Sequence, residues 1–361
     1  MAEDKKLISS LAKSEDAEVK TAEEQEDLHG ENLNDRVRVL SPGMMVAKRF
    51  FRSKLSVIGL TILVILFLFS FLGPVFSPWH DGGERVKDDS PSEIIVYSRI
   101  DYVIDGEEYS AFDISSSTST YNSRADMSLD HFLGTDTYGY DLFTDLMLGG
   151  RVSLTIGFVV IFLEAIIGII LGGLSGFFGG WVDNLIMRIV DILSCIPSLP
   201  IMLILSVILD ELGVTGMGRL YYLMGVLTLI GWTGIARIVR GQILSLREQE
   251  FMLAAKCAGL STRRKIFKHL LPNVMPQLIV SMTMGLGSII LTEATLGYLG
   301  LGAPLGTPTW GSMINAANNS ILMQDYPNFW LPPGICITLA ILAFNFVGDG
   351  LRDAFDPKMK R

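Results

Sequence analysis

The chain has 361 residues, 49% of them hydrophobic and 19% charged, and a formal net charge of −9. Its mean hydropathy of +0.41 is too high for an ordinary soluble domain. Several apolar runs of about 17 to 25 residues are long enough to cross a bilayer, so the composition predicts a multi-pass membrane protein. Nothing in it suggests nucleic-acid binding, and the three widely spaced cysteines predict neither a metal site nor a disulfide.

A polar segment precedes the first apolar run. Residues 1–35 hold eleven acidic and four basic side chains, a composition typical of disordered segments. We therefore expect residues 1–45 to be an acidic, disordered cytosolic tail. Basic side chains then precede the apolar run at about residues 55–76, and basic flanks favour the cytosolic face. Residues 46–76 are predicted to form an N-terminal transmembrane helix that starts in the cytosol.

A hydrophilic insert follows this helix. Residues 77–151 hold fifteen acidic and five basic side chains, which suits the external face. Two short β-prone runs within residues 94–104 precede Asp105-Gly106, a signal for a hairpin turn. We therefore expect residues 77–130 to form a small β-containing extracellular insert. The Ser/Thr run at residues 115–120 is predicted to be a flexible loop.

A glycine- and aspartate-rich segment comes just before the second span and reads HFLGTDTYGYD at residues 131–141. Gly134, Asp136 and Asp141 predict a turn cluster that leads into a helix. A catalytic role for the two aspartates is the alternative. Exposed aspartates in glycine-rich turns usually serve the turn, so we favour the structural interpretation.

Five further apolar runs predict five more spans. They lie at about residues 152–174, 192–209, 220–236, 278–299 and 331–347. In the first of these, Gly168, Gly172 and Gly176 recur at four-residue spacing, with Gly180 next. Small residues on one helix face permit close packing in lipid. Six spans place both termini in the cytosol, on the side where the basic loops fall.

The third span and its surroundings carry further signals. Pro197 and Pro200 should bend this span. Arg188 and Asp191 lie three residues apart, close enough on a helix to form an ion pair. The nearly uncharged residues 300–330, between the last two spans, are predicted to form an external loop at the membrane interface.

Two carboxylates, Glu164 and Glu293, lie within apolar runs. Intramembrane carboxylates are costly and are candidates for function. One interpretation makes them proton relays of a coupled carrier. The other, which we favour, has each hydrogen-bonded inside the helix bundle or close to a water-filled path.

The stretch from residue 247 to residue 273, between the fourth and fifth spans, is strongly basic. Its pattern predicts two short helices. An apolar face begins at Phe251 and stops at Gly259, and Ser261 is placed to cap a second helix. Pro272 marks the return into the next apolar run. Physical chemistry alone leaves two interpretations open: docking into a groove of another protein, or an amphipathic helix resting on the membrane surface.

This stretch resembles the cytoplasmic signature of ABC importer permeases, Glu-Ala-Ala, then Gly, then Ile-x-Leu-Pro. The matching residues are Leu253, Ala254, Ala255, Gly259, Leu271 and Pro272. Leu253 stands where the general pattern has Glu, and His269 where it has Ile; both departures are common in the dipeptide/oligopeptide branch. Residues 131–141 and 344–358 resemble stretches of the same branch, with Tyr140 in place of its usual Arg. In the family, the Ala-Ala and Gly loop is the coupling helix that seats in a cleft of the ATPase subunit.

The resemblance is to the dipeptide/oligopeptide/nickel class of importers. It implies an all-α membrane fold, the six-helix permease of a type I ABC importer, with residues 131–361 as a five-helix core and a coupling loop at 240–272. It also implies three kinds of partner in a bacterial plasma membrane: a homologous second permease, two cytosolic ATPases and an external substrate-binding protein. ATP and Mg²⁺ belong to the ATPases. The chain has no Gly-x-x-x-x-Gly-Lys-Ser/Thr motif, and we expect no cofactor on it.

The implied function is transport rather than catalysis. Peptides are the expected substrate, and nickel and oligosaccharides remain open. A proton-coupled secondary transporter that uses Glu164 and Glu293 is the alternative from another class. No His-Glu-x-x-His or Gly-x-Ser-x-Gly motif occurs, and the four histidines are isolated in the sequence, so no enzyme site is predicted.

Overall fold

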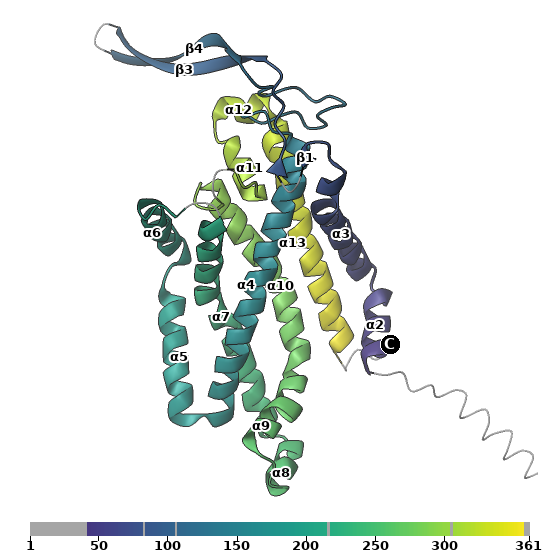
Figure 1. Ribbon diagram of the computed structural model, residues 1–361. Coiled ribbons are helices and arrows are strands. Elements are labelled where there is room, and N and C mark those ends of the chain that lie inside the picture. Colours follow the sequence, from purple (N-terminus) through teal and green to yellow (C-terminus); the bar gives the residue numbers. More distant parts are fainter. Residues whose placement is uncertain (1–41, 82–83, 105–106, 215–216, 304–305, 357–361) are drawn as a thin grey trace, which may run out of the picture. The chain divides into compact units, whose positions relative to one another are not determined.

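The computed structural model describes residues 42–81, 84–104, 107–214, 217–303 and 306–356, most of them helical (Figure 1). The longer helices are α2 (Pro42–Arg52), α3 (Lys54–Phe71), α4 (Leu142–Phe178), α5 (Gly180–Cys195), α6 (Ser198–Glu211), α7 (Met217–Arg247), α10 (Leu271–Tyr298) and α13 (Pro327–Phe355). The shorter ones are α8 (Glu250–Cys257), α9 (Thr262–Arg264), α11 (Trp310–Ala316), α12 (Ser320–Asp325), a 3₁₀ turn η1 (Gly73–Phe76) and a π-helical segment η2 (Lys265–Leu270).

Residues 1–41 of the predicted acidic tail lie outside the described residues. Its last four residues, 42–45, are helical instead, because α2 begins at Pro42, and proline is favoured in the first turn of a helix. Residues 50–361 form one unit by their contacts, and the packing described below is all within it.

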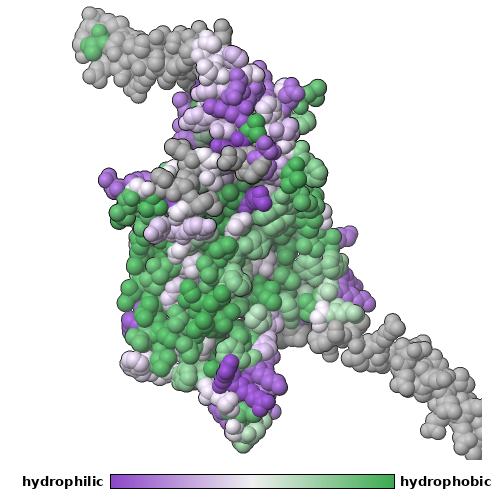
Figure 2. All heavy atoms as spheres, viewed as in Figure 1, coloured by the Kyte–Doolittle hydropathy of each residue, from purple (hydrophilic) through white to green (hydrophobic). Residues whose placement is uncertain are grey.

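Within the described residues, five helices are long and apolar enough to cross a membrane: α3, α4, α7, α10 and α13. The pair α5 and α6 makes a sixth if the two helices are counted as one broken span. The prediction of six apolar spans is therefore confirmed in this form. Most of the helices are longer than the apolar runs that predicted them. Figure 2 shows apolar residues covering the middle of the helices, with hydrophilic residues at both ends.

The predicted third span is wrong in its start. Helix α5 already begins at Gly180, and the axis turns by 77° between α5 and α6. The break falls at Ile196 and Pro197, where both residues are extended. A proline disfavours the helical conformation of the residue before it. Pro200 lies in the first turn of α6, where no backbone N–H is needed.

Helices α4 and α7 pack closely against each other, and three of the predicted glycines lie in this contact. A Cβ atom at Gly168 would lie 2.7 Å from Ile235, one at Gly176 would lie 2.9 Å from the carbonyl oxygen of Arg240, and one at Gly172 would overlap the backbone of Ala236. The small-residue face is therefore confirmed as a helix interface. The fourth glycine, Gly180, starts α5 and has open space around it.

In its described residues the hydrophilic insert contains four strands: β1 (His80–Asp81), β2 (Glu84–Arg85), β3 (Ser92–Ile104) and β4 (Glu107–Ser119). Strands β3 and β4 pair antiparallel from Ser92↔Ser119 to Ile104↔Glu107, so the predicted hairpin is confirmed. Its turn, residues 105–106, lies outside the described residues. The flexible loop expected at 115–120 is wrong for residues 115–119, because β3 is long enough to pair with them throughout.

Helix α4 connects the two ends of the unit. It starts beside the insert, and its last turns lie against Arg247, which donates from Nη1 to the carbonyl oxygen of Gly176 at 3.1 Å. A helix of 37 residues is about 55 Å long. The insert and the α8 segment therefore lie at opposite ends, as Figure 1 shows. The predicted loop 300–330 contains two short helices, α11 and α12. The N-cap residue of α11, Thr309, forms a capping box with Ser312.

Candidate functional site

Helix α8 is the predicted coupling helix, and its end has a defined geometry. Gly259 has φ +68°, the left-handed conformation that glycine adopts without strain. Its N–H donates to the carbonyl of Lys256 at 3.0 Å, and the N–H of Leu260 donates to that of Ala255 at 3.2 Å. This pair of bonds is a Schellman motif, so the prediction that Gly259 stops the helix is confirmed.

The side chains of α8 divide into two faces. Met252 and Ala255 are buried, and α8 contacts the end of α7 and the η2 segment. Leu253 is 53% exposed, and Ala254 is also exposed. The two alanines of the signature therefore point to different sides: Ala255 seats the helix on its own chain, and Ala254 lies outward beside Leu253.

The second half of the segment 247–273 does not form the separate short helix that the sequence predicts. The backbone continues from α9 through η2 directly into α10, in which Pro272 lies in the first turn. The N–H of Leu271 bonds to the carbonyl of Ile266, five residues earlier. Pro272 has no N–H to donate to the carbonyl of Lys268, which favours the wider π turn here. Ser261 begins this helix, but its side chain makes no capping hydrogen bond.

The remaining signature residues lie near this junction. Gly259 and Pro272 are exposed, and Leu271 is half-buried. The coupling loop is also shorter than the predicted 240–272, because residues 240–247 belong to α7.

The outward surface of this end is basic. Glu250 is the single acidic residue of α8 and the segment up to α10. The basic side chains of the same segment are Lys256, Arg263, Arg264, Lys265 and Lys268, all exposed except the half-buried Lys265. Figure 2 shows hydrophilic residues gathered here.

Ion pairs tie α5 to α7 near the same end. Arg240 of α7 donates from Nη2 to Oδ2 of Asp183 at 2.6 Å, and from Nε to Oδ1 at 2.5 Å. Ser175 of α4 donates to the same carboxylate. Asp191 pairs with Arg237 of α7 at 3.0 Å, and within the described residues it forms no pair with Arg188. The predicted Arg188–Asp191 pair is therefore wrong, because α7 brings a better-placed cation to Asp191.

The two intramembrane glutamates are held in different helix pairs. Glu293 of α10 is fully buried, and its Oε2 accepts a hydrogen bond from Ser153 Oγ of α4 at 2.8 Å. Ser153 also accepts from the backbone N–H of Trp310 at 3.3 Å. Glu164 of α4 is buried with its carboxylate against Gly231 of α7, where a side chain would overlap it. The arrangement of Glu293 agrees with a hydrogen-bonded group inside the bundle.

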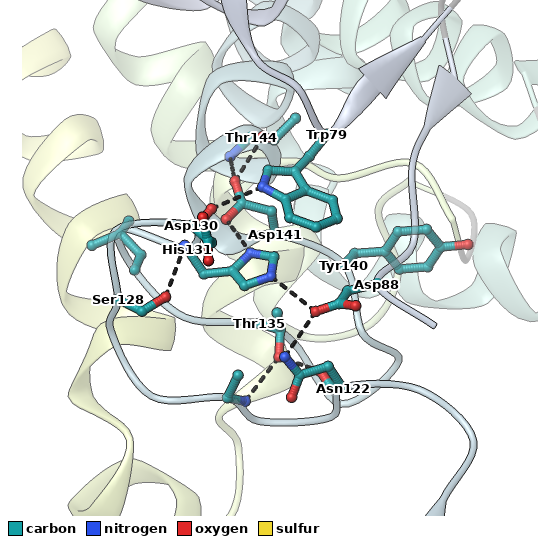
Figure 3. A network of polar contacts seen from close by, with 12 residues as sticks. Trp79, Asp88, Asn122, Ser128, Asp130, His131, Thr135, Tyr140, Asp141 and Thr144 are labelled. Carbon is teal, nitrogen blue, oxygen red and sulfur yellow. Dashed lines mark hydrogen bonds and ion pairs between the residues drawn. The ribbon is translucent and has the colours of Figure 1, made fainter. Parts of the chain in front are cut away.

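A polar cluster at the opposite end was missed in the sequence (Figure 3). His131 is buried, with Nδ1 at 3.0 Å from Oδ1 of Asp141 and Nε2 at 3.2 Å from Oδ2 of Asp88. The Trp79 ring stacks on the imidazole, with centroids 4.3 Å apart. The prediction that the histidines are isolated is therefore wrong for His131. No short-range signal could have revealed this, because Asp88 is 43 residues away.

The two aspartates of the turn segment serve the backbone. Asp141 is the N-cap of α4, and its Oδ2 accepts from the N–H and the hydroxyl of Thr144, both at 2.7 Å. Oδ1 of Asp136 accepts from the N–H of Tyr138 at 2.7 Å and of Tyr140 at 2.9 Å. Burial raises the pKa of Asp136 above its usual value, and these hydrogen bonds oppose the rise. The structural interpretation of both aspartates is confirmed.

Asp88 anchors the insert to this cluster. Oδ1 accepts from the N–H of Ser90 at 3.1 Å, and Oδ2 accepts from the Asn122 amide at 2.8 Å. Burial alone would raise the pKa of Asp88. Hydrogen bonds from Asn122, Ser90 and His131 together outweigh burial and lower the pKa to about 2.

An arginine from the insert lies beside Tyr140, the residue that departs from the family pattern. The guanidinium carbon of Arg85 is 3.9 Å from the centroid of the Tyr140 ring. Nη1 of the same arginine donates to Oδ2 of Asp145 at 2.7 Å, inside the first turn of α4. A guanidinium therefore occupies this position although residue 140 is not an arginine.

Comparison with known proteins defines the class of this chain. Residues 168–361 match the family described as binding-protein-dependent transport system inner membrane component. Residues 41–90 match the N-terminal TM domain of oligopeptide transport permease C. The chain therefore belongs to the binding-protein-dependent inner membrane permeases, the membrane-spanning subunits of ABC importers. It is a transport component and not an enzyme, and a permease of this class works with ATPase and binding-protein partners.

Two relatives, an oligopeptide and a dipeptide transport permease, agree with this assignment. The chain is 38% identical to the oligopeptide transport system permease protein OppC of Bacillus subtilis, over 87% of this chain and 88% of the relative. It is 34% identical to the dipeptide transport system permease protein DppC of Alkalihalophilus pseudofirmus, over 90% of this chain and 93% of the relative. A solved structure of the MetNI methionine ABC transporter aligns with 58% of this chain and 96% of its own, at 21% identity and a TM-score of 0.46.

Proposed function

We propose that this chain forms, with a homologous second permease, the path by which an ABC importer takes up oligopeptides or dipeptides. The names of its relatives support peptides as the substrate over nickel and oligosaccharides. An external binding protein delivers the peptide, and two cytosolic ATPases bind ATP and Mg²⁺. This chain itself holds no cofactor.

The charge distribution supports an orientation. The α8 end is basic, and basic segments flank membrane spans on the cytosolic side. The insert at the other end is acidic. We therefore place α8 in the cytosol, with both termini, and residues 77–130 outside the cell.

The geometry of α8 carries the proposed coupling role. The helix exposes Leu253 and Ala254 while Met252 and Ala255 hold it on its own chain. Only Glu248 and Gln249 separate it from α7, and only residues 258–261 separate it from the continuous helix α9–η2–α10. Because both linkers are short, a displacement of α8 is transmitted to two membrane helices.

The mechanism follows from this connection. Closure of the ATPase pair on ATP moves the cleft in which α8 sits. Helices α7 and α10 then move with it, and the permease pair changes between inward-open and outward-open states. ATP drives the change because the ATPase contacts α8 differently in the two states.

The test is a charge placed on the outward face of α8. Leu253→Asp introduces a carboxylate into the proposed apolar contact, and we expect ATP-driven peptide uptake to fall by about tenfold or more. The variant should still insert and should still bring down the second permease in affinity purification, with ATPase subunits lost or reduced. Glu250→Gln on the same helix is the matched control and should transport normally.

Two outcomes would contradict the proposal. Normal uptake by Leu253→Asp would remove the coupling role of this face. Purification of the native chain without any ATPase subunit, combined with proton-driven uptake, would replace the importer by a carrier.

A further inference from the structure

A cavity of about 520 Å³ lies between the outer ends of α3 and α4, next to the polar cluster. This volume is within the range of small-molecule binding sites, about 300 to 1,000 Å³. Its walls include Phe69 on α3 and Met147 on α4, and its rim includes Phe76, Leu129 and Phe132. The cavity is therefore mainly apolar and is built by two helices that span the membrane.

The rim exposes large apolar side chains to an unusual degree. Leu129 is 91% exposed, Phe76 is 82% exposed and Phe132 is 62% exposed. A contiguous exposed patch of this kind marks an interaction site. In water it would be unfavourable, since each such side chain gains about 1.5 to 3 kcal/mol when it is buried.

The position of the cavity indicates hydrocarbon as its occupant. Leu68 on α3 and its C-cap residue Leu72 are exposed and lie four residues apart, on one helix face, and the exposed Val75 and Phe76 continue this apolar surface to the rim. A face of this kind on a membrane-spanning helix contacts lipid chains. The cavity is thus continuous with a lipid-facing surface.

A tryptophan marks the depth of the cavity in the membrane. Trp79 lines it, and its Nε1–H donates to the backbone carbonyl of Asp130 at 2.9 Å. Tryptophan with an apolar ring and a satisfied N–H is typical of the level of the lipid headgroups. The mouth of the cavity therefore lies where a headgroup would be.

The charge at the mouth selects the headgroup. Asp130 and Asp141 both line the cavity, but Asp141 is already bonded to His131 and Thr144. Within the described part of the chain, the Asp130 carboxylate has no hydrogen-bond or ion-pair partner, and no Lys or Arg lines the cavity. An unpaired negative charge at this level favours an ammonium group.

We propose that this cavity binds one phospholipid with an amine-bearing headgroup, such as phosphatidylethanolamine. One acyl chain fills the space between Phe69 and Met147, and the ammonium group meets Asp130. The site lies at the end opposite to α8 and does not depend on which substrate is transported.

The experiment measures lipids retained by the whole transporter. The complex is reconstituted in nanodiscs that contain equal amounts of phosphatidylethanolamine and phosphatidylglycerol, released into mild detergent and examined by native mass spectrometry. We expect one phosphatidylethanolamine to be retained per copy of this chain, in preference to phosphatidylglycerol.

Two variants test the two parts of the site. Phe76→Ser combined with Leu129→Ser should lower retention by about tenfold, because two apolar contacts are lost. Asp130→Asn should abolish the preference for the amine headgroup while a lipid is still retained. The matched controls are Val64→Ser, on an exposed face of α3 outside the cavity, and Asp126→Asn, an exposed acid of the same loop.

Four results would overturn the proposal: no retained lipid in the native complex, equal retention of both lipids, unchanged retention by the variant that combines Phe76→Ser with Leu129→Ser, or an unchanged headgroup preference in Asp130→Asn. A photoreactive residue at position 129 provides an independent check. Cross-linking to phospholipid supports the site, whereas cross-linking to a segment of another subunit shows that protein covers the cavity and would also overturn it.

Discussion

At the scale of single residues, His131 joins groups that are far apart in the chain. Both of its ring nitrogens face carboxylate oxygens, of Asp141 and of Asp88. The two contacts, 3.0 Å and 3.2 Å long, are short enough for hydrogen bonds or ion pairs. The N-cap of α4 and the start of the hairpin are thereby held by one side chain.

The lowered pKa of Asp88 predicts how this contact responds to pH. A carboxyl group whose pKa is lower in the folded state stabilises the fold above its unfolded pKa, and this contribution is lost as pH falls through the folded pKa. For Asp88 the window runs from its ordinary value of 3.8 down to about 2.

We therefore expect Asp88→Asn to unfold at a lower temperature than the native chain at pH 7. The difference should shrink between about pH 4 and pH 2. Thermal unfolding of the detergent-purified protein, measured for both at each pH, checks this. A difference that stays constant over the range would show that Asp88 does not stabilise this end through its charge.

Glu293 gives a second prediction at this scale. Glutamine keeps an oxygen that can accept from Ser153, so Glu293→Gln should retain ATP-driven uptake. Glu293→Leu removes the acceptor from a buried hydroxyl and should cost about 1 to 3 kcal/mol of stability. Uptake assays and thermal unfolding distinguish the two effects. Loss of uptake in the glutamine variant alone, with normal stability, would point to proton transfer through Glu293.

At the scale of elements, neighbouring glycines of α4 differ in how closely they approach α7. A Cβ at Gly172 would overlap the backbone of Ala236, whereas one at the adjacent Gly173 would lie 3.8 Å from Ile243, an ordinary contact. The two positions differ by one residue and hence by about 100° around the helix.

Gly172→Ala should therefore separate the two helices and destabilise the protein by about 1 to 3 kcal/mol. Gly173→Ala should be neutral or slightly stabilising, because alanine restricts the unfolded chain. The unfolding temperature of each variant in detergent measures the difference. Equal stability of the two variants would contradict the close approach at Gly172.

Much of the element structure could be predicted from the sequence, for identifiable reasons. Apolar length defines membrane spans, four-residue glycine spacing defines a close helix face, and Gly259 was recognisable as a helix stop. The early start of α5 was missed because Asp183 and Asp191, both before the predicted start at residue 192, look like an interfacial loop in a hydropathy profile. Those charges are accommodated because α7 supplies Arg240 and Arg237 as partners.

The candidate site was predictable only in part. The first four signature residues lie within one short segment, 253–259, so the helix there and the glycine that ends it could be recognised from the sequence. The sequence could not predict which of the two alanines points outward, since that depends on how α8 packs against α7 and η2. The cluster around His131 could not be predicted either, because its partners come from residues 79–145, which are brought together only by the fold.

At the scale of the whole molecule, the insert and the coupling helix lie at opposite ends of α4. Asp141 caps one end of this helix beside the insert, and Gly176 near the other end accepts from Arg247. We propose that an external binding protein which presses on the insert is sensed at the α8 end through this continuous helix.

The hairpin offers a direct test. Ser92 and Ser119 are paired at its base, so residues 93–118 can be replaced by a short Gly-Ser linker without moving either end. We expect this variant to assemble and to keep its basal ATPase activity, and stimulation of that activity by the binding protein should fall. Unchanged stimulation and unchanged uptake would remove the proposed contact.

The adjoining ends of the hairpin also bear on how such permeases diversify. A segment that leaves and re-enters the fold at neighbouring positions can be lengthened, shortened or exchanged at a small loop-closure cost, since that cost grows only slowly with loop length. Evolution can then alter the external surface without changing the glycine contact between α4 and α7 or the N-cap that Asp141 forms on α4. The same entry point would accept a fluorescent domain or an epitope as a reporter of the outer face.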